Sequence, residues 1–185
     1  MSILNEYGVL RNRIDSHSDR VLAAWEQHFA CAEGCSGCCQ RDLSVFAIEA
    51  HGIRAWLREH PPGLRAPSPT GVSSALPVLE EPAGPGCAML DSVGRCGVYP
   101  VRPLICRSHG LPLAVPSEGG GLRGDVCPLN FDGGAALAEL PSGDFLSVET
   151  VDTVLAALDL RFSEEQGLPP GERFRLEELW DEAAS

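Results

Sequence analysis

Apolar residues recur at helical spacing at the start of the chain. Within residues 4–29 they are three, four or seven positions apart, which places them on one face of a helix; they are Tyr7, Leu10, Ile14, Val21, Trp25 and Phe29. The polar stretch 16–19 interrupts this face. The pattern therefore predicts one long amphipathic helix or two short ones.

A second helix is predicted over residues 45–57. Ser44 precedes it as its N-cap, because a serine hydroxyl accepts a hydrogen bond from the first helical turn, and Pro61 and Pro62 follow it. The apolar face of this helix consists of Val45, Ile48, Ile53, Trp56 and Leu57.

The C-terminal segment, about residues 144–185, predicts two more helices. From Phe145 onward one face is apolar and the opposite face is acidic; the apolar residues are Val148, Val151, Val154, Leu155 and Leu158. Pro169 and Pro170 end this helix. A last short helix over residues 173–183 presents Phe174, Leu176, Leu179 and Trp180.

The middle of the chain has little periodicity. Residues 61–86 are rich in Pro, Gly, Ser and Ala and are expected to form an irregular linker. In residues 87–110 a tight turn from Asp91 to Gly94 separates two short extended pieces, and Pro100 and Pro103 prevent a regular helix before Leu104. Residues 111–126 predict a Gly-rich loop or hairpin.

These elements predict a mainly α fold with long irregular loops. A chain of 185 residues suits a single domain over 1–185, with a metal-stabilised cysteine-cluster core at about 31–130 and helices flanking it. Metal ligation by thiolates contributes roughly 10–16 kcal/mol. This exceeds the cost, on the order of 3 kcal/mol, of closing the interval from Cys39 to Cys87.

Composition and charge exclude several classes of protein. The net charge is −12, whereas binding to the phosphate backbone requires a basic surface, so we expect no nucleic-acid partner. All 14 basic residues are arginine. The absence of lysine excludes a P-loop, a Schiff-base enzyme and a lysine nucleophile.

The chain is expected to be cytoplasmic. Its start lacks the pattern of a signal peptide, and no apolar run approaches the ~20 residues that span a bilayer. Thiols stay reduced in the cytoplasm, so clustered cysteines there indicate metal or redox chemistry more than disulfides. A disulfide framework is the less favoured alternative.

Eight cysteines are the candidate metal ligands, and all lie between residues 31 and 127. Four fall within one run of nine residues, and the set is Cys31, Cys35, Cys38, Cys39, Cys87, Cys96, Cys106 and Cys127. At four thiolates per site they form at most two sites. Adjacent side chains usually diverge, so Cys38 and Cys39 either serve two sites or only one of them binds. One four-thiolate site with the other cysteines buried or redox-active is the simpler alternative.

The cysteine spacing resembles that of a known family. The run Cys31-x3-Cys35-x2-Cys38-Cys39, followed by Cys87-Ala-Met-Leu, Gly94-Arg95-Cys96, Val98-Tyr99 and Arg102-Pro103-Leu104-Ile105-Cys106-Arg107, is similar to the YkgJ-type cysteine-cluster family. That family is described as a "putative zinc- or iron-chelating domain" with eight characteristic cysteines. The resemblance covers about residues 31–127 and implies metal binding, without implying an activity.

The identity of the metal stays open between iron and zinc. The compact triplet Cys31, Cys35 and Cys38 is typical of four-iron clusters, and Cys127-Pro128 is a feature of ferredoxin runs. Zinc sites usually pair two C-x2-C knuckles, and only Cys35 and Cys38 form one. We therefore expect a 4Fe-4S protein with a redox, electron-transfer or sensing role; the alternative is a structural zinc domain used for protein interaction.

Other residues near the cysteines have two interpretations each. Arg95, Arg102 and Arg107 either offset the charge of about −2 on a four-thiolate centre or are surface arginines that pair with Asp or Glu. His109 either replaces a cysteine ligand or is an exposed or hydrogen-bonding residue. The sequence offers no catalytic constellation, so we expect no enzymatic activity; an open metal site is the one route to catalysis left.

Overall fold

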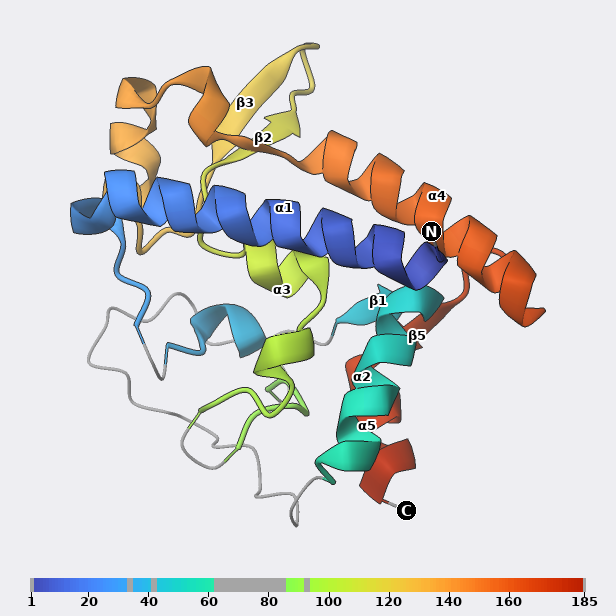
Figure 1. Cartoon of the computed structure of the whole chain (residues 1–185). Helices are drawn as coiled ribbons and strands as arrows, with labels where there is room; N and C mark the ends of the chain where they lie inside the picture. Colours follow the sequence, from blue (N-terminus) through green and yellow to red (C-terminus); the bar gives the residue numbers. More distant parts are fainter. Residues whose placement is uncertain (1, 33–34, 41–42, 62–85, 92–93, 185) are drawn as a thin grey trace. The chain divides into compact units, whose positions relative to one another are not determined.

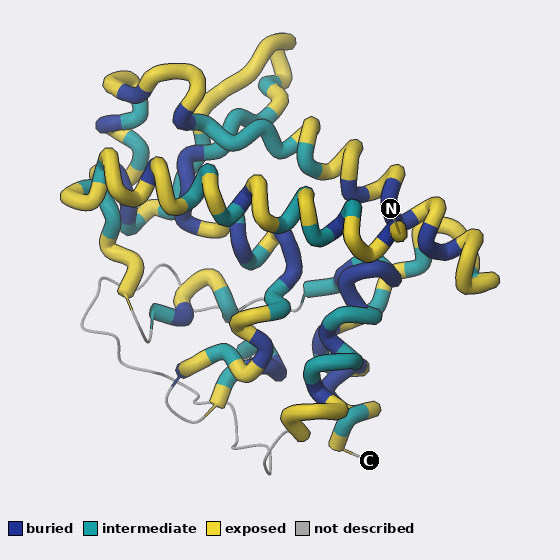
Figure 2. Tube along the Cα trace, in the orientation of Figure 1, coloured by how far each residue is buried: buried dark blue, intermediate teal, exposed yellow. Residues whose placement is uncertain are grey.

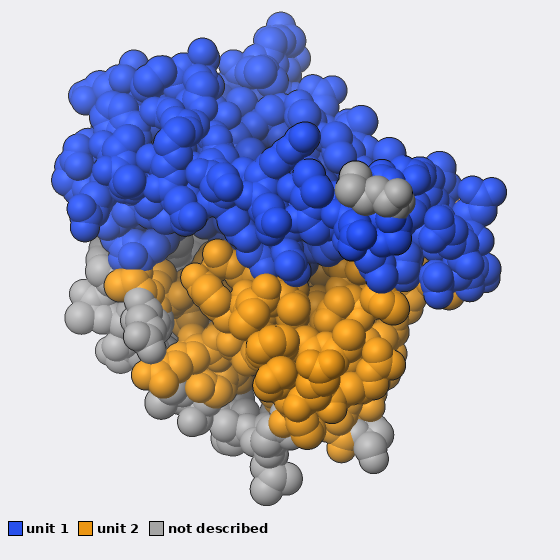
Figure 3. Space-filling view, viewed as in Figure 1, with its two compact units in different colours: residues 1–31, 103–167 blue, residues 32–102, 168–185 orange. Residues whose placement is uncertain are grey.

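The computed structural model describes residues 2–32, 35–40, 43–61, 86–91 and 94–184. The chain divides into two compact units, each assembled from two separate stretches of sequence (Figure 3). The first unit comprises residues 1–31 and 103–167, and the second comprises residues 32–102 and 168–185. The two units therefore alternate along the chain.

The first unit is built on three helices, which lie side by side in Figure 1. They are α1 (Ile3–Ala24), α3 (Leu104–Ser108) and α4 (Val148–Gln166). The first is a single unbroken helix, so the polar stretch 16–19 does not interrupt it. It begins at Ser2, whose hydroxyl accepts the Asn5 N–H at 3.3 Å. The predicted end at residue 29 is too late, because a short 3₁₀ turn, η1 (Glu26–His28), follows α1.

The buried face of α4 differs in part from the predicted one. Leu155, Leu158 and Phe162 are buried at helical spacing, whereas Val154 is 40 % exposed and Asp159 is buried. The buried stripe continues at steps of three and four residues from Leu155, and that geometry excludes position 154. The helix starts after Ser147 and ends at Gly167, whose left-handed conformation (φ +67°) suits glycine.

A small sheet in the first unit follows the order β3-β2-β4. Its strands are β2 (Leu113–Pro116), β3 (Leu122–Asp125) and β4 (Leu146–Ser147). The antiparallel pair of β2 and β3 confirms the hairpin interpretation of residues 111–126. The parallel pairing of β2 with β4 was not predicted. Two 3₁₀ segments, η4 (Phe131–Glu139) and η5 (Ser142–Asp144), lie between β3 and β4 in sequence.

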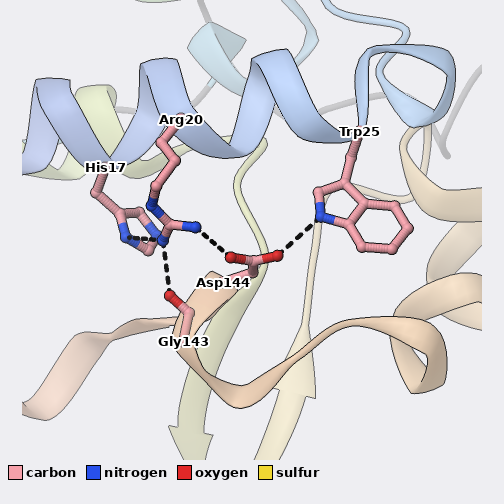
Figure 4. A network of polar contacts seen from close by, with 5 residues as sticks. All are labelled: His17, Arg20, Trp25, Gly143 and Asp144. Atoms are coloured by element: carbon pink, nitrogen blue, oxygen red, sulfur yellow. Dashed lines mark hydrogen bonds and ion pairs between the residues drawn. The ribbon is translucent and has the colours of Figure 1, made fainter.

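A polar network fixes η5 to α1 within this unit (Figure 4). The buried Asp144 carboxylate accepts hydrogen bonds from the Arg20 guanidinium and, at 2.8 Å, from the Trp25 indole N–H. Arg20 also donates to the Gly143 carbonyl oxygen at 2.7 Å and contacts His17 Nδ1 at 3.2 Å. These hydrogen bonds hold the pKa of Asp144 below its usual range, first through Arg20 and then through Trp25.

The second unit pairs two helices and a two-stranded sheet. Its elements are η2 (Gly37–Gln40), β1 (Ser44–Phe46), α2 (Ala47–Glu59), η3 (Tyr99–Val101), β5 (Arg173–Arg175) and α5 (Leu176–Ala184). Strand β1 is antiparallel to β5, with Val45 opposite Phe174. The prediction of Ser44 as an N-cap is therefore wrong, because Ser44 is in a strand and α2 begins at Ala47. The Glu49 carboxylate accepts the Phe46 N–H at 3.2 Å and caps the helix instead.

Helices α2 and α5 enclose the core of the second unit. Figure 2 shows buried residues along α2, and they are continuous over its first turn, from Ala47 to Ala50. The core residues come from four segments, and they include Val45, Ile53, Leu57, Met89, Val98, Leu176 and Leu179. Cys87 and Cys96 pack against this cluster, so the same core supports part of the candidate ligand set.

The mainly helical class is confirmed, and two other predictions stay open. Metal stabilisation and the single domain over 1–185 stay predictions. The linker 61–86 lies almost entirely outside the described residues. None of the helices in the described part of the chain combines the length and apolarity needed to cross a membrane.

Candidate metal centre

The eight candidate ligands divide between the two units. Cys31, Cys106 and Cys127 belong to the first, and the five others belong to the second: Cys35, Cys38, Cys39, Cys87 and Cys96. None of these eight cysteines, all of which are described, forms a disulfide. Cys31 and Cys38 are exposed, and the rest are half-buried.

In the second unit short-range backbone hydrogen bonds hold the first cysteines. The Cys35 N–H donates to the Ala32 carbonyl oxygen at 3.0 Å, and the Cys39 N–H donates to the Ser36 carbonyl oxygen at 2.9 Å. The Cys87 N–H donates to the Cys39 carbonyl oxygen at 2.7 Å. This backbone hydrogen bond brings the segment of Cys87 beside the cysteine run, although 47 residues separate the two in sequence.

The thiols of Cys38 and Cys39 interact directly. The pKa of Cys38 is lowered to about 6, first by a hydrogen bond from Cys39 and further by its own backbone N–H and the positive charge of Arg102, while burial opposes the shift. We expected these adjacent side chains to diverge, and whether they serve two sites or only one of them binds stays a prediction.

Cys96 is paired through the backbone with Leu90. Leu90 and Cys96 form an antiparallel bridge, and the Asp91 N–H donates to the Arg95 carbonyl oxygen at 2.9 Å. The centre of the turn predicted at residues 91–94 lies outside the described chain, because residues 92–93 are not described; Gly94, which follows them, is in the left-handed region (φ +80°). Burial raises the pKa of Cys96, whereas the Val98 N–H and Arg102 lower it in part.

The three arginines near the cysteines behave differently from one another. The positive charge of Arg102 lowers the pKa of both Cys38 and Cys96, which supports the interpretation of a cation that offsets thiolate charge. Arg107 donates twice, at 2.7 Å, to the Asp15 carboxylate, as one interpretation predicted, but it is buried and not a surface residue. Arg95 is exposed.

In the first unit a residue that we did not predict contacts a candidate ligand. Asn130 is fully buried, and its side-chain amide donates to Cys31 Sγ at 3.4 Å. The only signal in the sequence is its place three residues after Cys127, which by itself does not distinguish it from a turn asparagine. His109 is exposed at the end of α3, and its role as a ligand stays a prediction.

The thiol groups are the kind of donor that a thiophilic metal binds, but the described residues do not gather into a complete set of ligands. Thiolates bind zinc and iron-sulfur clusters, and a lowered thiol pKa together with a nearby cation favours the charged form that ligates. Among residues 2–32, 35–40, 43–61, 86–91 and 94–184, no three His, Cys, Asp or Glu side chains are grouped closely enough to hold an ion.

These features define a cysteine-rich, metal-binding class of protein. The chain belongs to the CxxCxxCC family, described as a "putative zinc- or iron-chelating domain", which matches residues 30–127. The match ends at the last cysteine, so Asn130 lies outside it. No curated protein and no solved structure matches the chain.

Proposed function

We propose that the chain binds an iron-sulfur cluster through its cysteine thiolates and uses it to transfer or sense electrons. The observation that carries the proposal is the match of residues 30–127 to a family described as chelating zinc or iron; the positive charge of Arg102, which lowers the pKa of Cys38 and Cys96, supports it. Four thiolates on an oxidised four-iron cluster leave a net charge of about −2, which a single guanidinium partly offsets. Such neighbouring charges and hydrogen bonds also tune the reduction potential of a cluster.

The preference for iron over zinc rests on spacing. The triplet Cys31-x3-Cys35-x2-Cys38 is compact, as in proteins that hold four-iron clusters. A reducing compartment keeps such thiols available, so we place the protein in the cytoplasm. When bound, a cluster of this kind exchanges one electron at a time, and this chain would supply its thiolates, the guanidinium of Arg102 and the core that supports Cys87 and Cys96.

A structural zinc domain used for protein interaction is the second candidate. The spacing Cys35-x2-Cys38 supports it, because zinc knuckles present two thiolates from a C-x2-C pair. In that case the metal would only hold irregular segments together.

Anaerobic purification followed by metal, sulfide and visible-absorption analysis tests the proposal. We expect iron and inorganic sulfide, with a broad visible absorption that decreases on one-electron reduction. A colourless protein with stoichiometric zinc and neither iron nor sulfide would refute the iron proposal and support the structural zinc domain.

A ligand variant separates metal binding from simple misfolding. Cys35→Ser should lose metal and lower the melting temperature, because the metal-binding free energy also stabilises the fold. The matched control is Ser36→Ala in the same turn, whose buried hydroxyl is not a thiolate ligand. Unchanged metal content in Cys35→Ser would remove Cys35 from the ligand set.

A further inference from the structure

The side chain of Asn130 has two backbone partners that fix its orientation. Oδ1 accepts the Ala30 N–H at 2.9 Å, and Nδ2 donates to the Gly110 carbonyl oxygen at 2.8 Å. A backbone N–H requires an acceptor and a carbonyl requires a donor, so the amide has only one orientation that satisfies both. This leaves the second N–H of Nδ2 for Cys31 Sγ, at 3.4 Å.

Because Asn130 is buried, its side-chain amide depends on these hydrogen bonds within the protein. Asn130 is 0 % exposed, and a buried amide without partners would be costly. The donor toward Cys31 is therefore held in place by the protein interior, whereas Cys31 itself is exposed. A fixed N–H that points at a sulfur atom stabilises the thiolate and limits the directions in which it can turn.

Gly110 provides the space for this contact. A Cβ atom at Gly110 would lie 3.1 Å from Cys31 Sγ and 3.2 Å from Asn130 Nδ2, which is closer than ordinary van der Waals contact. Its φ of +90° is also a conformation that favours glycine. Two independent reasons thus favour glycine at this position.

Asn130 also connects the segments that carry the three cysteines of the first unit. Its N–H donates to the Cys127 carbonyl oxygen at 2.8 Å. Gly110, which its side chain contacts, follows Cys106 by four residues. Asn130 therefore links Cys31 to the backbone at Gly110 through its side chain and to the backbone at Cys127 through its own N–H.

We propose that Asn130 is a positioning residue for the metal-binding thiolate of Cys31, and that Gly110 leaves the space in which that thiolate sits. The inference rests on the proposed metal-binding function and adds the residues that orient one ligand. Groups that hydrogen-bond to a ligand typically change metal affinity by about 10–100-fold when they are replaced.

A double-mutant cycle with Co²⁺ as the probe tests the inference. Asn130→Asp keeps the shape and the acceptor for Ala30 but replaces the donor toward Cys31 and the Gly110 carbonyl with an oxygen; the Cys31→Ala background separates these two losses. We expect it to weaken Co²⁺ binding about 10–100-fold and to shift the thiolate-to-cobalt charge-transfer absorption. In a Cys31→Ala background the same substitution should have no further effect on affinity. An equal loss in both backgrounds would show a merely structural role and overturn the inference.

A second pair of variants keeps the test valid if Asn130→Asp does not fold. Gly110→Ala should also weaken Co²⁺ binding, whereas Gly121→Ala should not. Gly121 has a similar φ of +81°, but a Cβ atom added there would meet nothing within 4 Å, so this variant reports backbone strain alone. Equal losses in the two glycine variants would overturn the inference.

The outcome also separates this inference from the proposed function. A wild-type chain that binds neither Co²⁺ nor iron overturns the proposed function and this inference with it. A wild-type chain that binds Co²⁺, with Asn130→Asp and Gly110→Ala binding equally tightly, overturns this inference alone.

Discussion

Two ion pairs on α1 have the same length and differ in burial, and they should differ in their contribution to stability. Arg107 donates to Asp15 at 2.7 Å, and Arg161 donates to Glu6 at 2.7 Å. The Arg107 side chain is 6 % exposed, whereas the Arg161 side chain is 53 % exposed. Each pair joins α1 to another helix of the first unit; the carboxylates differ less and in the other direction, Asp15 being 39 % and Glu6 27 % exposed, so the comparison tests burial of the guanidinium.

We expect Asp15→Asn to destabilise the first unit and Glu6→Gln to have little effect. Hydrogen bonds to charged groups contribute about 1.5–3 kcal/mol, and the partial exposure of Asp15 reduces this to about 1.5–2 kcal/mol through solvent screening. For a chain of this size that corresponds to a decrease of about 3–8 °C in melting temperature. Both substitutions preserve shape and helix propensity, and an exposed pair contributes little because water screens it.

Urea unfolding followed by circular dichroism measures both variants, with far-UV signal reporting the helices. The reasoning would be refuted by equal losses in Asp15→Asn and Glu6→Gln, or by a larger loss in Glu6→Gln. Either result would mean that burial of the guanidinium does not determine the strength of these pairs.

Three further predictions concern other contacts. The pKa of Asp144 is lowered in the folded protein, first by Arg20, so the stability that its carboxylate contributes is present above the unfolded-state pKa and is lost as pH falls through the folded-state pKa. In urea unfolding between about pH 7 and pH 3, the free energy of unfolding should therefore decrease less in Asp144→Asn than in the wild type. Parallel decreases in the two proteins would contradict this. The Trp56 indole N–H donates to the Gly97 carbonyl oxygen at 2.9 Å, beside Cys96, so Trp56→Phe should cost about 1 kcal/mol by the same assay, and no change would show that water replaces the donor. Addition of a strong chelator to the purified protein should lower its melting temperature, because metal binding stabilises only the folded chain; an unchanged temperature after complete metal removal would exclude a stabilising role.

The hydrophobic periodicity of the sequence predicted most helices but not the residues at which they end. The periodicity of residues 4–29 predicted α1, because one buried stripe is visible within a few turns. It did not predict where the helix ends, since Trp25 belongs to the Asp144 network and Phe29 packs against Phe131. Ser44 was misassigned for a similar reason, because its strand exists only through pairing with β5, near the opposite end of the chain.

The thiol set, the family and the helical class follow from the sequence alone, since each of these depends on residues that are close together or on spacing. Which groups surround the thiols depends on the folded chain: Arg102 acts on Cys38 and Cys96, Arg107 pairs with Asp15 instead, and Asn130 donates to Cys31. Most of these contacts join segments that are distant in sequence, and their energies depend on burial. Neither property can be read from composition or periodicity, because both arise only when the chain has folded.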